Sequence, residues 1–407
     1  MVYPPTPKAS KSSAKSSPSQ GLPEVLGAGG KTPTETCRQL WVINETARQL
    51  NMKILKVIIL VGLIISIISC NNSSTSRFNY STPETKGYST SKLNTLKEFL
   101  SKSGTSSMII LIDGEVIFEF GNTNKKHLIH SIRKCLLNSL FGIAIDQGVI
   151  DTSMTLRQLG IQDVHTLTDS ELNSRIADLL KSKSGIYHPA AAMSTGMINS
   201  LPERNSYKPG EYHYYNNWDF NTLGAILEQQ TGESIYEMFL NKIAKPIGML
   251  DYDGKYVEID GEAENVKMPM TDGFYQYELS KSKYPAYHFR MSTRDLALYG
   301  QLYLNNGIWD NKQIISSDWI KASTRLTSVS NDKNNTGYGM LWKLRLSKDN
   351  KKAISFYHTG VGIHMIAVYP DLKMVLVHRV DTENDYDYNK SDLHKTIELV
   401  MDSKIEK

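Results

Sequence analysis

Four strand-like runs near the end of the chain, separated only by short turns, constrain its fold most. They lie near residues 338–345, 353–357, 362–369 and 373–380. Because parallel neighbours need long crossover connections, runs joined by short turns predict an antiparallel sheet. Two earlier β-rich runs within residues 107–120 flank Asp113-Gly114, which predicts a hairpin that adds to the same sheet.

Helical patterns occupy much of the remaining chain. Residues 131–148 are apolar around most of a helix circumference, which predicts a buried helix. Further helices are expected over residues 221–244 with a break at Gly232, from residue 292, and over 391–402. The expected fold class is α/β, with an antiparallel sheet flanked by terminal helices and an all-helical region, the helical insert at about 150–290.

Composition excludes several classes of function. The 407-residue chain has a net charge of +4, of which residues 1–70 carry +5 and the remainder −1. Nucleic acid is therefore not an expected partner, because phosphate binding needs a concentrated basic surface. The three cysteines form no C-x-x-C pair, there is no H-E-x-x-H, and His127 and His130 are interpreted as surface or packing residues. No metal site and no cofactor are predicted.

The first 51 residues precede a segment that has the parts of an export signal. Residues 1–51 are rich in Ser, Lys and Pro at their start and are predicted to be a disordered extension that translation from Met52 would omit. Met52, Lys53 and Lys56 lead into the apolar run Val57 to Ile68, whose 12 residues are too few to span a bilayer. Residues 52–69 are therefore predicted to be a signal peptide.

The signal-like segment ends in Ile67-Ile68-Ser69-Cys70, which resembles the bacterial lipobox. That resemblance implies that Cys70 is lipidated and becomes the mature N-terminus. The chain is then expected to be an exported bacterial lipoprotein, anchored to a membrane and facing the periplasm or the cell exterior. Residues 70–92 are predicted to be a polar tether and residues 93–400 the folded domain.

A serine followed three positions later by lysine occurs five times, beginning at Ser12, Ser89, Ser131, Ser280 and Ser330. On a helix this spacing places both side chains on one face, so that lysine can activate serine as a nucleophile. Only Ser131 begins a buried helix, where burial lowers the pKa of Lys134 towards that of a useful base. Cys135 follows Lys134 directly, points about 100° away from it, and is interpreted as a packing residue.

Two later motifs accompany Ser131. Residues 209–224 contain Pro-Gly, an aromatic and Asn-rich segment, and Leu-Gly, and Tyr-x-Asn fits from Tyr214 or from Tyr215. His358-Thr359-Gly360 follows, 143 residues after Tyr215, which is itself 84 residues after Ser131. Lys102-Ser103-Gly104 and Lys183-Ser184-Gly185 are similar triplets but precede the tyrosine.

In this order the three motifs resemble those of the serine β-lactamase and penicillin-binding superfamily, in its class C β-lactamase and DD-peptidase branch. The resemblance covers roughly residues 95–400, and the flanking Pro209-Gly210 and Leu223-Gly224 select Tyr215-Asn216-Asn217 as the second motif. It implies a serine hydrolase that forms an acyl-enzyme on Ser131.

The resemblance also implies a role for each motif residue. Ser131 attacks the substrate carbonyl, and Lys134 and Tyr215 transfer protons, with the choice of general base left open. Asn217 binds the substrate amide, His358, Thr359 and Gly360 hold its far end, and the backbone N–H groups of Ser131 and Val361 form the oxyanion hole.

Three departures leave the substrate open. Position 358 is histidine where most β-lactamases have lysine, position 216 is asparagine where the family has serine, and Arg133 is bulky. The expected substrates are small molecules or peptides with an amide or ester bond: D-amino-acid peptides, β-lactams or small esters. The alternative is a catalytically idle lipoprotein that keeps the fold as a sensor or scaffold.

Overall fold

The computed structural model describes residues 78–405, and within this part a nine-stranded sheet is the largest element. In spatial order its strands are β1 (Asn79–Tyr80), β3 (Glu115–Gly121), β2 (Thr105–Ile112), β15 (Met374–Val380), β14 (His364–Tyr369), β13 (Ala353–Gly360), β12 (Lys343–Leu346), β11 (Thr336–Tyr338) and β10 (Ser328–Asn331). All neighbours are antiparallel except β1 and β3. The predicted sheet is therefore confirmed.

The early hairpin joins the late strands through β2 and β15. Asp113 and Gly114 connect β2 to β3, and both have positive φ, at 52° and 82°. Such a turn matches the twist of the two strands, and glycine adopts it without strain. β2 then pairs with β15 from Thr105 to Ile112, which places the hairpin beside the C-terminal strands.

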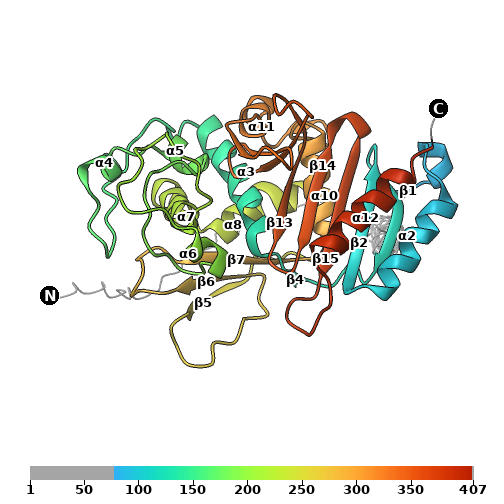
Figure 1. The fold of residues 1–407 in the computed structure, drawn as a ribbon, viewed down its shortest axis with the longest axis horizontal. Coiled ribbons are helices and arrows are strands. Elements are labelled where there is room, and N and C mark those ends of the chain that lie inside the picture. Colours follow the sequence, from blue (N-terminus) through green and yellow to red (C-terminus); the bar gives the residue numbers. More distant parts are fainter. Residues whose placement is uncertain (1–77, 406–407) are drawn as a thin grey trace, which may run out of the picture. The chain divides into compact units, whose positions relative to one another are not determined.

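Helices cover both faces of this sheet (Figure 1). On one face lie α2 (Thr90–Lys102) and α12 (Lys390–Asp402), whose Leu96 and Val400 pack with Ile110 and Leu376 of the sheet. On the other face lies α10 (Thr293–Leu304), packed against alternate residues of the same strands. The terminal helices that the sequence predicts are confirmed.

The remaining helices lie mostly between β4 and α10 in the sequence. They are α3 (Arg133–Asp146), α4 (Asp169–Leu172), α5 (Ile176–Leu180), α6 (Thr195–Asn199), α7 (Asn217–Thr231), α8 (Ile235–Phe239), α9 (Lys245–Ile247) and, after α10, α11 (Ser317–Ser323). Short helical turns are η1 (Pro83–Lys86), η2 (His130–Ile132), η3 (Leu240–Ala244) and η4 (Pro370–Leu372). The predicted break at Gly232 is the left-handed C-cap of α7. In the described part of the chain, no helix has the length and apolar character to span a bilayer.

The insert at about 150–290 is not all helical, which corrects the sequence prediction. It contains β5 (Tyr256–Asp260), β6 (Gly273–Tyr277) and β7 (Ala286–Met291), which form a sheet of order β4-β7-β6-β5 with β4 (His127–Leu128). β5 is largely exposed and pairs in parallel with β6, so it lacks both the apolar alternation and the short turn that reveal a strand. A small hairpin, β8 (Ile308–Trp309) and β9 (Lys312–Gln313), follows α10.

The predicted tether also differs from the structure where the two overlap. β1 pairs with β3, Tyr88 is buried, and α2 begins at Thr90, so residues 79–92 belong to the folded domain. Because this stretch is mostly polar, the sequence gives no sign that Tyr88 is buried in the core. The extension 1–51, the signal peptide 52–69, Cys70 and the start of the tether lie outside the described residues.

Candidate active site

Ser131 lies at the point where a strained turn meets the buried helix α3. His130 precedes it with a φ of 48°, a left-handed conformation that side chains other than glycine seldom adopt. The His130 ring is held on both sides: it stacks on His364 at 5.5 Å, and its Nε2 lies 2.9 Å from Thr382 Oγ1. Ser131 then occupies the turn η2, and α3 begins at Arg133. The buried helix that the sequence predicts from residue 131 is therefore present, but it begins at Arg133, after this turn.

Lys134 is directed at the serine. Its Nζ donates a hydrogen bond to Ser131 Oγ at 3.0 Å, and only 1% of the residue is exposed. It makes no ion pair with a carboxylate within residues 78–405. Burial lowers the pKa of Lys134 well below 10.5, and the charges of Arg133 and Lys343 lower it further.

Tyr215 faces the same serine from the segment before α7. The Lys134 Nζ lies 4.9 Å from the centroid of its ring. Burial raises the pKa of the Tyr215 hydroxyl above 10, although its hydrogen bond to Ser131 opposes this. The phenol is therefore protonated at neutral pH, which suits a proton donor better than a base.

His358 completes this group from β13 but is turned away from the open cavity. Its Nδ1 donates to the backbone oxygen of Thr359 at 2.9 Å, and its Nε2 lies 3.5 Å from the Tyr215 hydroxyl oxygen. Burial, followed by the charges of Lys343 and Lys134, lowers the pKa of this fully buried imidazole well below 6.5. The ring is thus neutral and supports Tyr215, which differs from the expectation that it holds the far end of the substrate.

Asn217 and its neighbour Asn216 have different environments. Asn216 caps α7, because its side chain accepts a hydrogen bond from the Trp218 N–H at 3.0 Å. The Asn217 amide nitrogen donates to the Ala192 backbone oxygen at 2.6 Å, while its Oδ1 is buried without a hydrogen-bond partner in the part of the chain described here. Asn217 also lines the cavity, so its side chain lies beside the space that a substrate would occupy.

β13 approaches the serine closely because its last residue is Gly360. A Cβ added at Gly360 would lie 2.6 Å from the Ile129 backbone oxygen and 3.1 Å from His130 Cβ. Only glycine permits this contact between the strand and the turn that precedes Ser131. The strand also extends further than the sequence predicts, since it continues through the motif His358-Thr359-Gly360.

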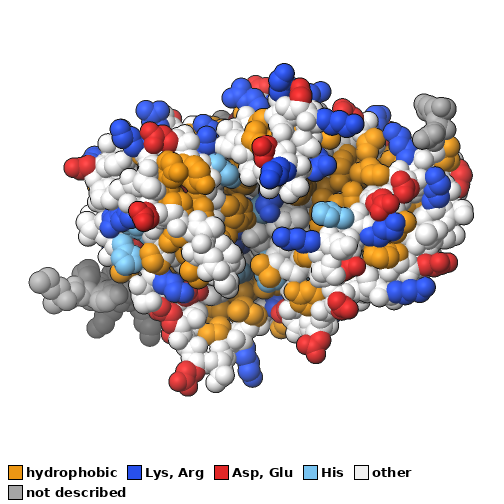
Figure 2. All heavy atoms as spheres, in the orientation of Figure 1, with side chains coloured by type: hydrophobic (Ala, Val, Ile, Leu, Met, Phe, Trp, Pro, Cys, Tyr) orange, Lys and Arg blue, Asp and Glu red, His pale blue; other side chains and the backbone are white. Residues whose placement is uncertain are grey.

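A cavity of about 1480 Å³ opens above these residues. Its lining includes every proposed site residue except Lys134 and His358, namely Ser131, Tyr215, Asn217, Thr359, Gly360 and Val361. It continues as an apolar trough beside α12, lined by Ile354, Tyr357, Ile363, Met365, Tyr369, Leu372, Leu393, Ile397 and Met401. In Figure 2 the surface is hollowed near the middle of the view, with hydrophobic side chains exposed beside the sheet.

Lys343 is a cavity residue that the sequence analysis missed. It lies on β12, and its Nζ donates to Thr359 Oγ1 at 3.0 Å. The alternation Lys343-Leu344-Arg345-Leu346 was the available signal, because Leu344 and Leu346 are core residues and the two cations must face the other way. Burial lowers the pKa of Lys343 to about 8.

The other sequence expectations near the site concern Arg133 and Cys135. Arg133 is buried, with its guanidinium 4.1 Å from the Tyr287 ring centroid and its Nη2 donating to Asn221 Oδ1 at 3.1 Å. Cys135 is a free, fully buried thiol whose Sγ lies 3.8 Å from the Leu341 backbone oxygen. Neither lines the cavity. Among residues 78–405, no group of three or more His, Cys, Asp or Glu side chains is arranged to hold a metal ion.

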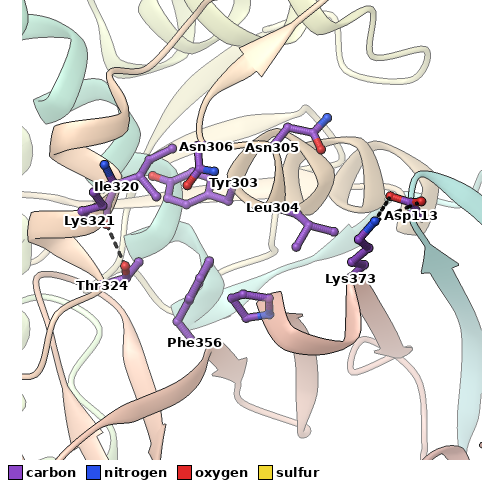
Figure 3. A pocket seen from close by; sticks show the side chains of 11 residues that line it. Asp113, Tyr303, Leu304, Asn305, Asn306, Ile320, Lys321, Thr324, Phe356 and Lys373 are labelled. Atoms are coloured by element: carbon purple, nitrogen blue, oxygen red, sulfur yellow. Dashed lines mark hydrogen bonds and ion pairs between the residues drawn. The ribbon is translucent and has the colours of Figure 1, made fainter.

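A second, smaller cavity of about 370 Å³ shares no residue with the first. Figure 3 shows it between the end of α10, α11 and the sheet, with Tyr303 and Phe356 on its walls. Its Asp113 and Lys373 form an ion pair with each other at 3.4 Å. The hydroxyls of its Tyr303 and Thr324 donate to Asn138 Oδ1 and to the Ile320 backbone oxygen, so neither is hydrogen-bonded to a base.

Comparison with known proteins identifies the family of this chain. The family model described as Beta-lactamase matches residues 107–397. An uncharacterized protein of Alkalihalophilus pseudofirmus is 22% identical over 252 residues, which cover 61% of this chain and 69% of that protein.

Three solved structures with the same fold belong to proteins that are named differently. A Bacillus anthracis protein named as a 6-aminohexanoate-dimer hydrolase has a TM-score of 0.58 at 18% identity, covering 80% of this chain and 87% of that one. The octameric penicillin-binding protein homologue of Pyrococcus abyssi has 0.57 at 18%, covering 78% of each chain. A class C beta-lactamase in complex with cefoxitin has 0.53 at 14%, covering 77% and 99%. With the family model matched over most of the folded domain, the chain belongs to the beta-lactamase family.

Proposed function

We propose that the protein is a serine hydrolase that cleaves an amide or ester bond through an acyl-enzyme on Ser131. The observation that carries this proposal is the hydrogen bond of 3.0 Å between Lys134 Nζ and Ser131 Oγ, made by a fully buried lysine without a carboxylate partner in residues 78–405. Membership of the beta-lactamase family supports the same reaction type.

In the first step Ser131 Oγ attacks the substrate carbonyl carbon while the neutral Lys134 amine accepts the serine proton. The backbone N–H groups of Ser131 and Val361, both of which line the cavity, stabilise the oxyanion. The C–N or C–O bond to the leaving group then breaks, and the Tyr215 hydroxyl donates the proton that the leaving group needs. Lys134 returns its proton to Tyr215.

In the second step water attacks the acyl-enzyme ester and Ser131 leaves. One water proton returns to Ser131 through the same lysine, so the enzyme is restored and the acid product is released. Asn217 Oδ1, which has no protein partner in the described region, accepts a hydrogen bond from the substrate amide.

The substrates that we propose are D-amino-acid peptides, β-lactams or small esters and amides, and the reaction takes place in the cell envelope. The signal-like segment 52–69 and the lipobox-like residues before Cys70 support export and a lipid anchor.

The experiment that tests the proposal is reaction with a fluorophosphonate probe, followed by peptide mapping. We expect one modified residue, Ser131, and turnover of at least one ester, D-Ala-D-Ala peptide or chromogenic cephalosporin in a panel. A folded protein that neither reacts with the probe nor turns over any of these compounds is the idle scaffold, and the proposal is then wrong.

A further inference from the structure

The cavity of Ser131 is larger than a small ester or a β-lactam requires. Its volume is about 1480 Å³, whereas pockets for drug-sized ligands usually enclose about 300–1,000 Å³. Part of this space is the apolar trough beside α12, which belongs to the same cavity as Ser131. Figure 2 shows hydrophobic side chains exposed on this side of the hollow. The trough therefore offers room for a part of the substrate that the three motifs do not contact.

The helical wall of the trough is apolar surface that the fold leaves uncovered. On α12, Thr396 and Val400 are fully buried against the sheet. Ile397 and Met401, each one position further along, are only partly buried and line the cavity. A helix that had the sheet as its sole partner would be expected to carry polar residues beside the buried row. The apolar side of α12 is thus wider than its contact with the sheet.

The opposite wall is formed by β13 and β14. Ile354 of β13 has no partner on β12, because the register between the two strands shifts by one residue after Arg345. Such a bulge redirects a side chain, and Ile354 is 44% exposed and lines the cavity. The partly buried rings of Tyr357 and Tyr369 line the same wall. Both walls therefore turn apolar groups towards the space between them.

The trough is long and leads away from the nucleophile. Ile354 lies six residues before Gly360 on β13, a distance of about 20 Å at the rise of a strand. On the helical wall, Leu393 to Met401 covers about 12 Å. An extended hydrocarbon chain of about ten carbons has the length of that helical wall. Because Gly360 contacts the turn before Ser131, one end of the trough lies beside the serine.

The chemistry of the trough distinguishes between possible occupants. Between Leu393 and Met401, α12 contributes only His394 and Ile397 to the lining, and the lining of the whole cavity contains no Asp or Glu. A polar peptide placed there would lose hydrogen bonds to water without regaining them from these walls. An aliphatic chain has no such cost and gains free energy from the apolar area that it buries.

We propose that the apolar trough binds an aliphatic chain of the substrate, about ten carbons long, so that the protein cleaves esters or amides of lipid-like molecules. This inference rests on the proposed function and assigns its substrate class. The trough and Ser131 share one cavity, so a chain that fills the trough is joined to the bond that the serine attacks. Ile354 and Ile397, one on each wall, are specificity-determining residues.

The experiment compares short and long chains on either side of the cleaved bond. The first pair is the para-nitrophenyl esters of butanoic and decanoic acid, with the chain on the acyl side. The second pair is the acetate esters of para-ethylphenol and para-decylphenol, with the chain on the leaving group. Phenol release is followed below the concentration at which the esters form micelles, at steady state and with enzyme in excess, so that acylation is seen even where turnover is slow.

We expect the wild-type protein to favour the long-chain member of at least one pair by about tenfold or more in kcat/KM, since each fully buried CH₂ group strengthens binding by up to about fourfold. Ile354→Gln and Ile397→Gln should each lower this ratio at least about threefold, because a polar side chain then faces the alkyl chain.

Leu399→Gln is the matched control. Leu399 lies on α12 like Ile397 and is also partly buried, but it is not part of the cavity lining, so this variant should keep the wild-type ratio. Equal fluorophosphonate labelling shows that the variants are folded at the active site. Ile354 is an exposed position, so Ile354→Gln keeps the test decisive if Ile397→Gln does not fold.

Two results would overturn the inference while the proposed function stands. One is labelling of Ser131 without faster reaction of the long-chain member in either pair. The other is a preference for the long chain that survives in both isoleucine variants or that falls equally in Leu399→Gln. Failure of the wild-type protein to react with the fluorophosphonate and with all four esters would instead reject the proposed function, and the inference with it.

Discussion

The Nζ of Lys134, in the first turn of the buried helix α3, lies 3.0 Å from the Oγ of Ser131, which occupies the turn η2 just before that helix. Three features hold this pair in place: the strained His130 before it, the glycine at the end of β13, and the ring of Tyr215 over the lysine. Burial lowers the pKa of this amine, which favours the neutral form that the proposed general base needs.

Replacement of the nucleophile tests this pair most directly. We expect Ser131→Ala to abolish fluorophosphonate labelling and to lower kcat at least about 1000-fold, because Ser131 carries the hydroxyl to which Lys134 is hydrogen-bonded. Ser280→Ala and Ser330→Ala are the controls, since their hydroxyls already donate to Glu262 and Thr336 away from Lys134. Labelling that persists in Ser131→Ala would show that another residue is the nucleophile.

The pH dependence should report the protonation of Lys134. A base acts when it has lost its proton, so kcat/KM for a neutral ester should rise with pH through the pKa of Lys134, which lies well below 10.5. The charge of Lys343 contributes to that lowering, so Lys343→Met should move the rising limb to higher pH.

Lys352→Met, which removes an exposed lysine outside the cavity, should leave the limb where it is. If the rising part of the pH profile of kcat/KM does not move in a folded Lys343→Met variant, the electrostatic link between Lys343 and Lys134 is contradicted.

Gly360 should tolerate no side chain. In Gly360→Ala the new methyl group would meet the Ile129 backbone oxygen, so either β13 or the turn before Ser131 must move. We expect a loss of about 1–3 kcal/mol in the free energy of unfolding and a large fall in kcat. Gly196→Ala, where the nearest atom is 4.0 Å away, should melt no lower than wild type, and full activity in Gly360→Ala would refute the close approach.

Cys135 should serve packing alone. It is fully buried, its Sγ contacts the Leu341 backbone oxygen, and burial raises the pKa of the thiol well above 9. Cys135→Ala should keep most activity and lose about 1 kcal/mol of stability. Iodoacetamide should not modify this thiol in the folded protein, and a fall in kcat at an unchanged melting temperature would assign the thiol a part in the reaction.

The lipid anchor makes a separate prediction. Native protein isolated from membranes should begin at Cys70 and carry the added mass of acyl chains, as the lipobox-like sequence requires. Intact-mass measurement checks this. A mature chain that begins at Met1 without lipid would be inconsistent both with the anchor and with translation from Met52.

Local signals in the sequence were sufficient to predict the sheet and the order of the motifs. Asp113-Gly114 requires a hairpin because both residues accept positive φ, and the apolar circumference of residues 131–148 requires burial. Burial in turn distinguished Ser131 from the four other serines with the same spacing. Each of these features depends on residues that are close together in the sequence.

Features that depend on distant pairing could not be predicted. β5 becomes a strand only because β6 lies beside it, and Lys343 faces the cavity only through its register with Tyr357. The orientation of His358 likewise follows from its contact with Tyr215, which is 143 residues earlier. The sequence shows which residues are present, but tertiary contacts determine which of them line the cavity.

The pairing of β2 with β15 has a consequence for how the protein folds. The strand that ends at Ile112 pairs with one that begins at Met374, so the middle of the sheet joins segments more than two hundred residues apart. Closing so long a loop is slow, and the early hairpin has a free edge until the C-terminal strands have been synthesised. Folding of this domain can thus be completed only after Val380 has been synthesised, and a chain that stops before Val380 leaves β2 exposed to aggregation.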